Sequence, residues 1–285
     1  MALFPRFHLF EIEDQSWCPE FVVKFIQTYL TALWNFRIPA VRHTAAEAAA
    51  NIILENLPNA SLYTFVDPCA GAGGPIPAIE KALGTEYSHS VQFILADIKP
   101  RVEEWKAIKK EQKNISFIQD SVDAAELGKV TSGKECRIFN ISFHHFNDTS
   151  AKKVLHSAMQ FTDAYIIFEF LQRDLTTFLF WCVTTISPLP FMHALLQGSL
   201  LQMCFMFVIW VALGIDGFVS MLRTRTHEEI KNLTRAAEGI SEGWVFKHGR
   251  SRIIGPWYIH WHLAFRTLDR KANNGEEAMV LPLRA

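Results

Sequence analysis

Acidic residues follow three successive apolar runs of the chain, and their spacing gives the first indication of chemistry. The run "LYTFV" leads into Asp67, "VQFILA" into Asp97, and "ISFI" is followed closely by Asp120. Carboxylates at the ends of neighbouring strands lose hydration and repel one another unless a ligand uses them. An acid after the second strand is well suited to bind the two hydroxyls of a ribose. The pattern therefore favours a site for a nucleoside cofactor.

A glycine-rich stretch, "VDPCAGAGGP" at 66–75, joins the first of these runs to the next helical segment. Glycine lets the backbone approach a ligand closely, and the start of a helix offers free N–H groups. Such a loop is also common as a plain strand-to-helix turn. The acids that end the following strands are what favour the cofactor interpretation.

The middle of the chain alternates between short apolar runs and helical patterns. Strands are predicted at 62–66, 91–96, 115–118, 136–142 and 164–170, and helices at 75–83, 100–112 and 149–161. This alternation indicates βαβ units and a parallel sheet, whose ligands lie at the carboxyl ends of the strands.

Helices are also expected on both sides of this alternating region. They are predicted at 19–34 and 44–57, the second with Thr44 and Glu47 as a capping box, and a further helix follows Thr226. A hairpin predicted at 243–268 should pair with the same sheet.

Three motifs carry a resemblance to a known family. "VDPCAGAGG", "ADIKP" and "IQDSVD" resemble motifs I, II and III of class I S-adenosylmethionine-dependent methyltransferases, whereas "AGAGGPIP" does not fit the G-x-G-x-x-G loop of dehydrogenases. Over nearly the whole chain, the sequence resembles a subgroup with an apolar, membrane-like insertion. The resemblance implies an α/β, Rossmann-like sheet that is mostly parallel with its final strand antiparallel. It also implies helices on both faces and S-adenosylmethionine as the cofactor.

The resemblance further implies which residues surround the cofactor. These are Asp67, Ala70, Gly71, Gly73, Asp97, Ile98, Asp120, Ser121 and Asn140. Asp67 and the loop backbone would contact the amino acid part of the cofactor, and Asp97 would hold its ribose. Ile98 would pack on the adenine and Asp120, presented beside Ser121, would accept from its amino group. Asn140 would lie beside the methionine moiety.

Two adjacent histidines, His144 and His145, follow the fourth predicted strand. Imidazole titrates near neutral pH, so either histidine is a candidate catalytic base. Equally, one could pack in the core while the other faces solvent. The sequence presents no persuasive cluster of metal ligands, and no metal is expected.

An apolar insertion separates the parallel region from the final hairpin. From Leu175 to Ile215 the chain holds no Asp, Glu, Lys or Arg, and prolines divide this stretch near residue 188. One membrane crossing would place two parts of a single sheet on opposite sides, so crossings number zero or two. We expect a helical hairpin that dips into one leaflet, with Arg173, Arg223 and Arg225 near the headgroups.

A lid or a dimer interface would bury the same apolar side chains as a membrane. His193, Gln197 and Gln202 in the middle of the segment suit a protein-lined cavity better than lipid tails. The insertion can therefore be membrane-associated or a lid, and both possibilities stay open.

Composition limits the other possibilities. The net charge is −1 and no basic run is present, which argues against a nucleic-acid partner. Five widely spaced cysteines favour a reducing, intracellular location over a disulfide framework, with membrane association on the cytosolic side.

We predict a helical cover at 1–58, a cofactor-binding core at 59–173 and 226–270, and the insertion at 174–225. The oligomeric state is not determined.

The function predicted from these features is methyl transfer to oxygen or carbon of a hydrophobic small molecule. The acceptor would be a lipid or a polyketide- or terpene-like metabolite, as in secondary-metabolite biosynthesis. Two alternatives remain. The cofactor site could support a cyclisation or pericyclic rearrangement without methyl transfer, or the chain could be a non-catalytic membrane partner of another enzyme.

Overall fold

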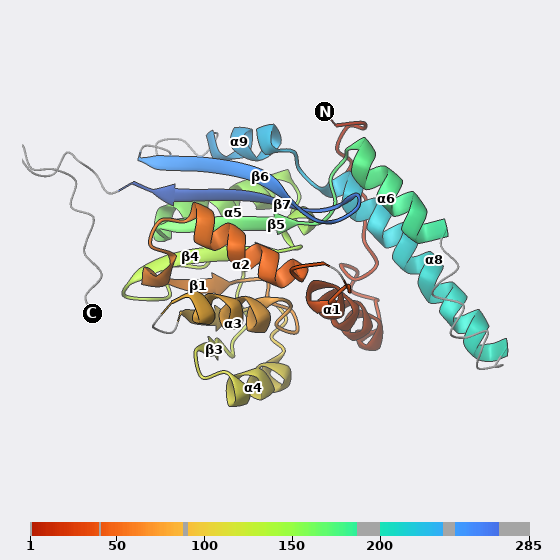
Figure 1. The fold of residues 1–285 in the computed structure, drawn as a ribbon, viewed down its shortest axis with the longest axis horizontal. Coiled ribbons are helices and arrows are strands. Elements are labelled where there is room, and N and C mark those ends of the chain that lie inside the picture. The colour runs from red at the N-terminus through yellow and green to blue at the C-terminus, as the bar shows by residue number, and fades with distance from the viewer. Residues whose placement is uncertain (1, 40, 88–90, 187–199, 236–242, 268–285) are drawn as a thin grey trace, which may run out of the picture.

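A seven-stranded sheet forms the centre of the molecule (Figure 1). The computed structural model describes residues 2–39, 41–87, 91–186, 200–235 and 243–267. The strands are β1 (Tyr63–Asp67), β2 (Gln92–Leu95), β3 (Ile115–Phe117), β4 (Lys134–Asn140), β5 (Ala164–Glu169), β6 (Trp244–Ile254) and β7 (Trp257–Arg266).

The strand order is β3-β2-β1-β4-β5-β7-β6. Strands β1 to β5 pair in parallel, and β7 runs antiparallel to both β5 and β6. This confirms the predicted mostly parallel sheet and the pairing of the late hairpin with it. Because the chain order changes direction between β1 and β4, their carboxyl ends diverge into loops that open a crevice for a ligand.

Helices lie on both faces of the sheet and at one end of it. They are α1 (Glu20–Asn35), α2 (Ala45–Asn56), α3 (Ile76–Glu86), α4 (Val102–Glu111), α5 (Asp148–Phe161), α6 (Leu175–Ile186), α8 (Leu200–Arg223) and α9 (His227–Arg235), with 3-10 turns η1 (Ala60–Leu62) and η2 (Phe143–His145). The predicted capping box is confirmed: Thr44 Oγ1 accepts from the Glu47 N–H, and the Glu47 side chain accepts from the Thr44 N–H. Local sequence therefore fixes where α2 begins.

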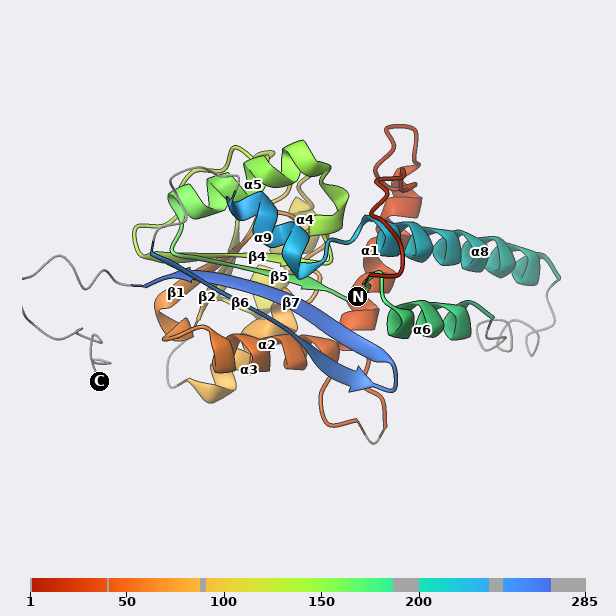
Figure 2. The same cartoon turned by 90° about the horizontal axis from the view of Figure 1, so that it is seen from above.

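The alternation of side chains along the strands builds two separate cores. Ile138 and Ile166 pack in the core with α2 and α3, whereas Phe139 and Ile167 pack in the other core with α5 and α9. Figure 2 shows α2 and α3 on one side of the sheet and α5 and α9 on the other. Burial on both faces explains why these strands are apolar throughout.

Helices α6 and α8 lie side by side and project from the end of the sheet (Figures 1 and 2). The Trp181 indole donates to the Gly214 carbonyl at 2.8 Å, and its ring packs against Phe218. This pair is the predicted apolar helical hairpin. Its proline break, His193 and Gln197 lie outside the described residues, as does the side chain of Gln202.

No helix in the described ranges combines the length and the apolar content needed to cross a bilayer.

The prediction that three arginines contact lipid headgroups is wrong. Arg173, Arg223 and Arg225 are all at most 2 % exposed. They form ion pairs with Glu229, Asp14 and Asp148 respectively. Arg223 and Arg225 also donate to backbone carbonyls around η2. Because loops and carboxylates of the core surround them, their side chains turn inward and fasten the hairpin to the sheet.

Candidate cofactor site

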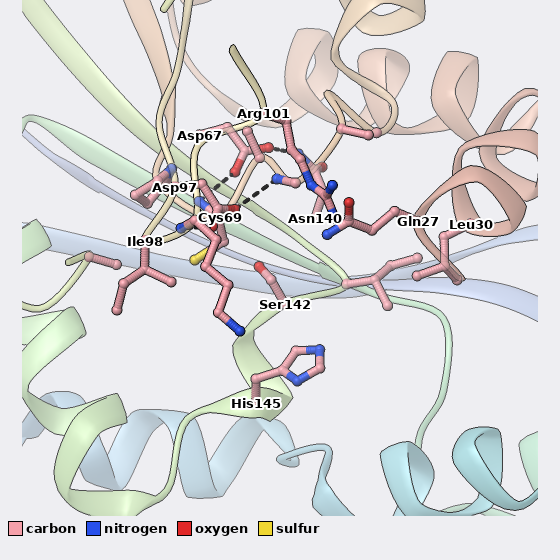
Figure 3. Close-up of a pocket in the computed structure, with 18 of the residues that line it drawn as sticks. Gln27, Leu30, Asp67, Cys69, Asp97, Ile98, Arg101, Asn140, Ser142 and His145 are labelled. Carbon is pink, nitrogen blue, oxygen red and sulfur yellow. Dashed lines mark hydrogen bonds between the residues drawn. The ribbon is translucent and has the colours of Figure 1, made fainter. Parts of the chain in front are cut away.

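A cavity of about 450 Å³ opens at the carboxyl ends of β1, β2 and β4 (Figure 3). Residues of α1, of η2 and of the N-terminal segment line its other sides. Seven of the residues predicted from the sequence line it: Asp67, Ala70, Gly71, Asp97, Ile98, Asn140 and His145.

Asp67, the last residue of β1, is buried beside Asn140. Its Oδ1 accepts from the Cys69 N–H at 3.0 Å, and its Oδ2 accepts from Asn140 Nδ2 at 2.8 Å. Burial raises the pKa of Asp67 to about 7, although both hydrogen bonds favour its charged form. The Asn140 carbonyl oxygen is buried and has no hydrogen-bond partner among the described residues. These two side chains can therefore receive a cationic group of a ligand.

Asp97, which follows β2, connects two loops of the site. Its Oδ2 accepts from the Gly71 N–H and its Oδ1 from the Lys99 N–H, both at 2.8 Å. Burial raises its pKa, while the two backbone hydrogen bonds oppose that rise. A carboxylate has about four lone-pair positions, so acceptor capacity remains for a pair of hydroxyl groups. Asp97 is thus held rigidly in a position to bind a diol.

The glycines of the loop serve two different purposes. Gly71 has φ +49° and lines the cavity, and its carbonyl accepts from the Trp105 indole at 2.9 Å. Gly73 has φ +104° and is not among the lining residues; a Cβ there would lie 2.5 Å from Ile108 Cδ1. Gly73 therefore permits α4 to pack closely, whereas the sequence interpretation had placed it against the cofactor.

The predicted residues after β3 lie outside the cavity. Asp120 and Ser121 are exposed, and Ser121 Oγ donates to the Ile98 carbonyl at 2.7 Å. Val122 and Asp123 line the cavity in their place. The Val122 N–H donates to the Asp97 carbonyl at 2.9 Å and turns the loop inward two residues later than expected.

The two histidines of η2 have different surroundings. His144 is buried behind the cavity wall, with Nδ1 2.9 Å from Glu169 Oε2 and its backbone N–H donating to Glu169 Oε1. His145 lines the cavity opposite Asp67 and Asp97, as Figure 3 shows.

The pKa of His145 bears on the catalytic base expected from the sequence. Its Nδ1 lies 2.8 Å from Glu11 Oε2 and 2.9 Å from Asp14 Oδ1. Burial opposes a charge on His145, but hydrogen bonds to Asp14 and Glu11 outweigh burial and hold its pKa well above the usual range. An imidazolium has no lone pair to accept a proton. These surroundings argue against a base at His145.

The N-terminal segment contributes residues that the sequence interpretation missed. Glu13 and Asp14 line the cavity, and Gln27, Leu30 and Trp34 of α1 complete its wall. The acids of "FEIEDQ" are visible in the sequence, but nothing local indicates that they meet a loop more than a hundred residues away.

Comparisons with known proteins find similarity in structure but not in sequence. No family model matches the sequence. No curated protein matches it either. Among solved structures, the plantazolicin methyltransferase BpumL, in complex with a monoazolic desmethylPZN analog and SAH, is similar with a TM-score of 0.53 at 10 % identity, over 86 % of this chain and 89 % of that chain.

A putative O-methyltransferase from Nostoc punctiforme is similar with a TM-score of 0.51 at 13 % identity. The match covers 86 % of this chain and 60 % of that chain, so the present chain spans less than two thirds of that protein's length. At such identities the likeness is one of fold.

Proposed function

We propose that this chain, which has the class I S-adenosylmethionine-dependent methyltransferase fold, transfers a methyl group from S-adenosylmethionine to a hydrophobic small molecule. One observation carries the proposal. Asp67 and Asp97, from adjacent strand ends, hold the Gly71 loop around a cavity of about 450 Å³ at the point where strand order reverses. That volume suits a nucleoside-sized ligand together with part of an acceptor.

The lining residues can be matched to parts of the cofactor. Asp97 would accept from both ribose hydroxyls, and Asp67 with the free Asn140 oxygen would receive the ammonium group. Ile98 is 59 % exposed beside the cavity, an unusual position for a large apolar side chain, and an adenine ring would cover it. Asp123, which lines the cavity whereas Asp120 does not, would accept from the adenine amino group.

The reaction requires few groups from the protein. An acceptor oxygen or carbanion attacks the methyl carbon, the S–CH₃ bond breaks, and its electron pair returns to sulfur. A proton lost by the acceptor passes to water. Holding the two reactants in line supplies much of the acceleration. Exclusion of water by α1 and the N-terminal segment favours the loss of the sulfonium charge.

Apolar lining supports a hydrophobic acceptor. Val23, Leu30 and Trp34 of α1, together with Ala124 and Phe146, face the cavity. We propose that the reaction serves secondary-metabolite biosynthesis and that the acceptor is a lipid or a polyketide- or terpene-like molecule.

The surface of the α6–α8 hairpin supports a contact with a membrane surface. Leu175, Leu179 and Val183 on α6 are each more than half exposed, and Phe207 and Ile215 on α8 are similarly exposed. Side chains at i, i+4 and i+8 share one helix face, so α6 presents an apolar stripe. Cosedimentation with phospholipid vesicles tests this point: Leu179→Gln/Val183→Gln should reduce vesicle binding severalfold, and unchanged binding would contradict it.

The domain organisation follows from the same interpretation. We propose that residues 1–58 cover the cofactor-binding core formed by 59–173 and 226–270, and that 174–225 form the inserted unit. Cys18, Cys69, Cys136 and Cys182 are free thiols, which supports action on the cytosolic side of the cell.

The deciding experiment separates cofactor binding from transfer. Titration calorimetry with S-adenosylhomocysteine should show one site per chain. Incubation with methyl-labelled S-adenosylmethionine and lipophilic phenols or enols should then transfer label to the organic phase, with a mass increase of one methyl group. Absence of cofactor binding would refute the proposal, and a product of unchanged mass would replace transfer with rearrangement.

A further inference from the structure

Charged side chains from distant parts of the chain meet behind the cavity wall. Glu11 and Asp14 come from the N-terminal segment, His144 and His145 from η2, and Arg223 from the end of α8. We call these five residues the Glu11 cluster. Glu11, His144 and Arg223 are at most 4 % exposed, whereas the side chains of His145 and Asp14 are 24 % and 34 % exposed, so the cluster is buried on one side and open to the cavity on the other.

The donor atoms of the cluster are close enough to share one ion. One ligand atom each from Glu11, His144 and His145 lies within 4.8 Å of the others. Glu11 Oε2 is 2.8 Å from His145 Nδ1, and Glu11 Oε1 is 3.6 Å from His144 Nε2. Ligands about 2.1 Å from a metal lie roughly 3.0–3.4 Å apart in octahedral or tetrahedral geometry. Small side-chain adjustments would therefore bring these three donors onto one centre.

Two carboxylates of the cluster compete for one imidazole hydrogen. Glu11 Oε2 is buried and lies 2.8 Å from His145 Nδ1 and 3.1 Å from Arg223 Nη1. His145 Nδ1 faces Glu11 Oε2 and Asp14 Oδ1 within 2.9 Å but carries at most one hydrogen to donate. Only one of the two carboxylates can accept that hydrogen, and a metal ion bound in its place would interact with both.

Outer contacts orient the ligands as in protein metal centres. His144 Nδ1 lies 2.9 Å from Glu169 Oε2, which leaves Nε2 facing Glu11. A histidine that binds a metal usually donates its other ring N–H to a carboxylate in this manner. Arg223 pairs with Asp14 at 2.7 Å and donates to the His145 carbonyl at 2.8 Å, and so fixes the loop that carries both imidazoles.

We propose that Glu11, His144 and His145 bind one divalent transition-metal ion. The ion displaces to water the proton that His145 otherwise holds between Glu11 and Asp14, because histidine binds a metal only as the neutral imidazole. Two imidazoles and one carboxylate suit Zn²⁺, Fe²⁺ or Mn²⁺, whereas Mg²⁺ prefers oxygen ligands alone. Three protein ligands leave coordination positions open, and His145 brings the ion to the cavity wall. If the proposed methyl transfer holds, the ion binds the acceptor hydroxyl there and lowers the pKa of its proton, which leaves to water. The metal site itself does not depend on that function.

A second group of histidines provides an internal control. His227, His248 and His262 lie together near α9 and the β6–β7 pair, with His227 Nδ1 3.4 Å from His262 Nδ1. The rings of His227 and His248 are stacked with centroids 3.3 Å apart and an interplanar angle of 14°. Lone pairs in the planes of stacked parallel rings do not converge on a common point. These three histidines are therefore not expected to bind a metal ion, in contrast to the Glu11 cluster.

The test uses the full-length chain, freed of metal with a chelator and then dialysed, without a histidine tag. Titration with ZnCl₂ should show one equivalent bound, and MgCl₂ at the same concentration should not compete. His145→Ala and Glu11→Gln should each weaken Zn²⁺ binding at least about 100-fold. The matched variant His248→Ala should bind Zn²⁺ as the wild type does, and S-adenosylhomocysteine binding reports separately on the cofactor site.

Two titration results would overturn the proposal. One is a wild-type chain that takes up no Zn²⁺ in the micromolar range, and the other is loss of binding in His248→Ala but not in His145→Ala. X-ray absorption at the zinc edge of the wild type avoids any variant that fails to fold. It should show two imidazole ligands and no sulfur, and a sulfur ligand or a third imidazole would also refute the assignment.

Discussion

The two sides of the cavity are built on different physical principles. On the cofactor side, Asp67 and Asp97 are held by backbone N–H groups of their own and neighbouring loops. On the opposite side, the Glu11 cluster joins side chains from segments up to 212 residues apart (223 − 11) through ion pairs. The first arrangement follows once the parallel strands form, whereas the second exists only when every partner is present. The two sides should therefore respond differently to mutation.

The largest effect should come from breaking the Glu11 cluster. Arg223→Met leaves Glu11 and Asp14 without their guanidinium partner, and we expect a loss of about 3–5 kcal/mol in the free energy of unfolding. Urea denaturation measures it. The control is Lys106→Met, which removes the exposed pair with Glu103 and should cost at most about 0.5 kcal/mol. A loss below 1 kcal/mol for Arg223→Met would show that the cluster is not an interdependent unit.

On the cofactor side, substitution should affect binding more than folding. Asp97→Ala removes the predicted acceptor of two ribose hydroxyls, and charge-assisted hydrogen bonds of about 1.5–3 kcal/mol imply a roughly 10- to 100-fold loss of S-adenosylhomocysteine affinity. Calorimetry measures it. Asp120→Ala, at an exposed position outside the cavity, should bind as the wild type does. Equal losses in both variants would restore the role that the sequence assigned to Asp120.

The glycine loop allows a comparison between neighbouring residues. Gly73→Ala should cost about 1–3 kcal/mol of stability, because the new Cβ would lie 2.5 Å from Ile108 Cδ1 at φ +104°. Gly74→Ala should cost about 1 kcal/mol, since φ is +47° there but no atom lies within 4 Å of the new Cβ. The double variant Gly73→Ala/Ile108→Ala tests the contact. It should show less loss than the two single changes added together, and strict additivity would exclude the contact as the cause.

A smaller effect is expected from pH on the cofactor side. Burial raises the pKa of Asp67 to about 7, so below that pH most of the free protein carries a neutral Asp67. The cofactor ammonium should favour the ionised form, so affinity should fall by up to about tenfold for each pH unit below 7, or about 1.4 kcal/mol. Calorimetry between pH 5 and 8 measures it. Asp67→Asn should bind more weakly with a flatter profile, and a flat wild-type profile would contradict the assignment.

Secondary structure was largely predictable because its signals are local. The Thr44–Glu47 capping box defines the start of α2, and apolar runs of the right length define the buried strands. The acids at 67 and 97 were identifiable because parallel strands bring their carboxyl ends to one edge. That Asp120 lies outside the cavity could not be seen in the sequence, because the turn after β3 includes a hydrogen bond from the Val122 N–H to the Asp97 carbonyl.

The sequence by itself therefore determined the βαβ order, the glycine loop and the strand-end carboxylates, since each depends on residues near one another in the chain. Only the tertiary structure decided that three arginines turn inward, that His145 meets Glu11 and Asp14, and that Gly73 accommodates Ile108. Those contacts join segments that are far apart in the chain. The local sequence pattern of one segment does not predict which other segment it will contact. The tertiary packing of the elements, and not the hydrophobic periodicity of the sequence, decides which charged side chains lie next to each other in the folded protein.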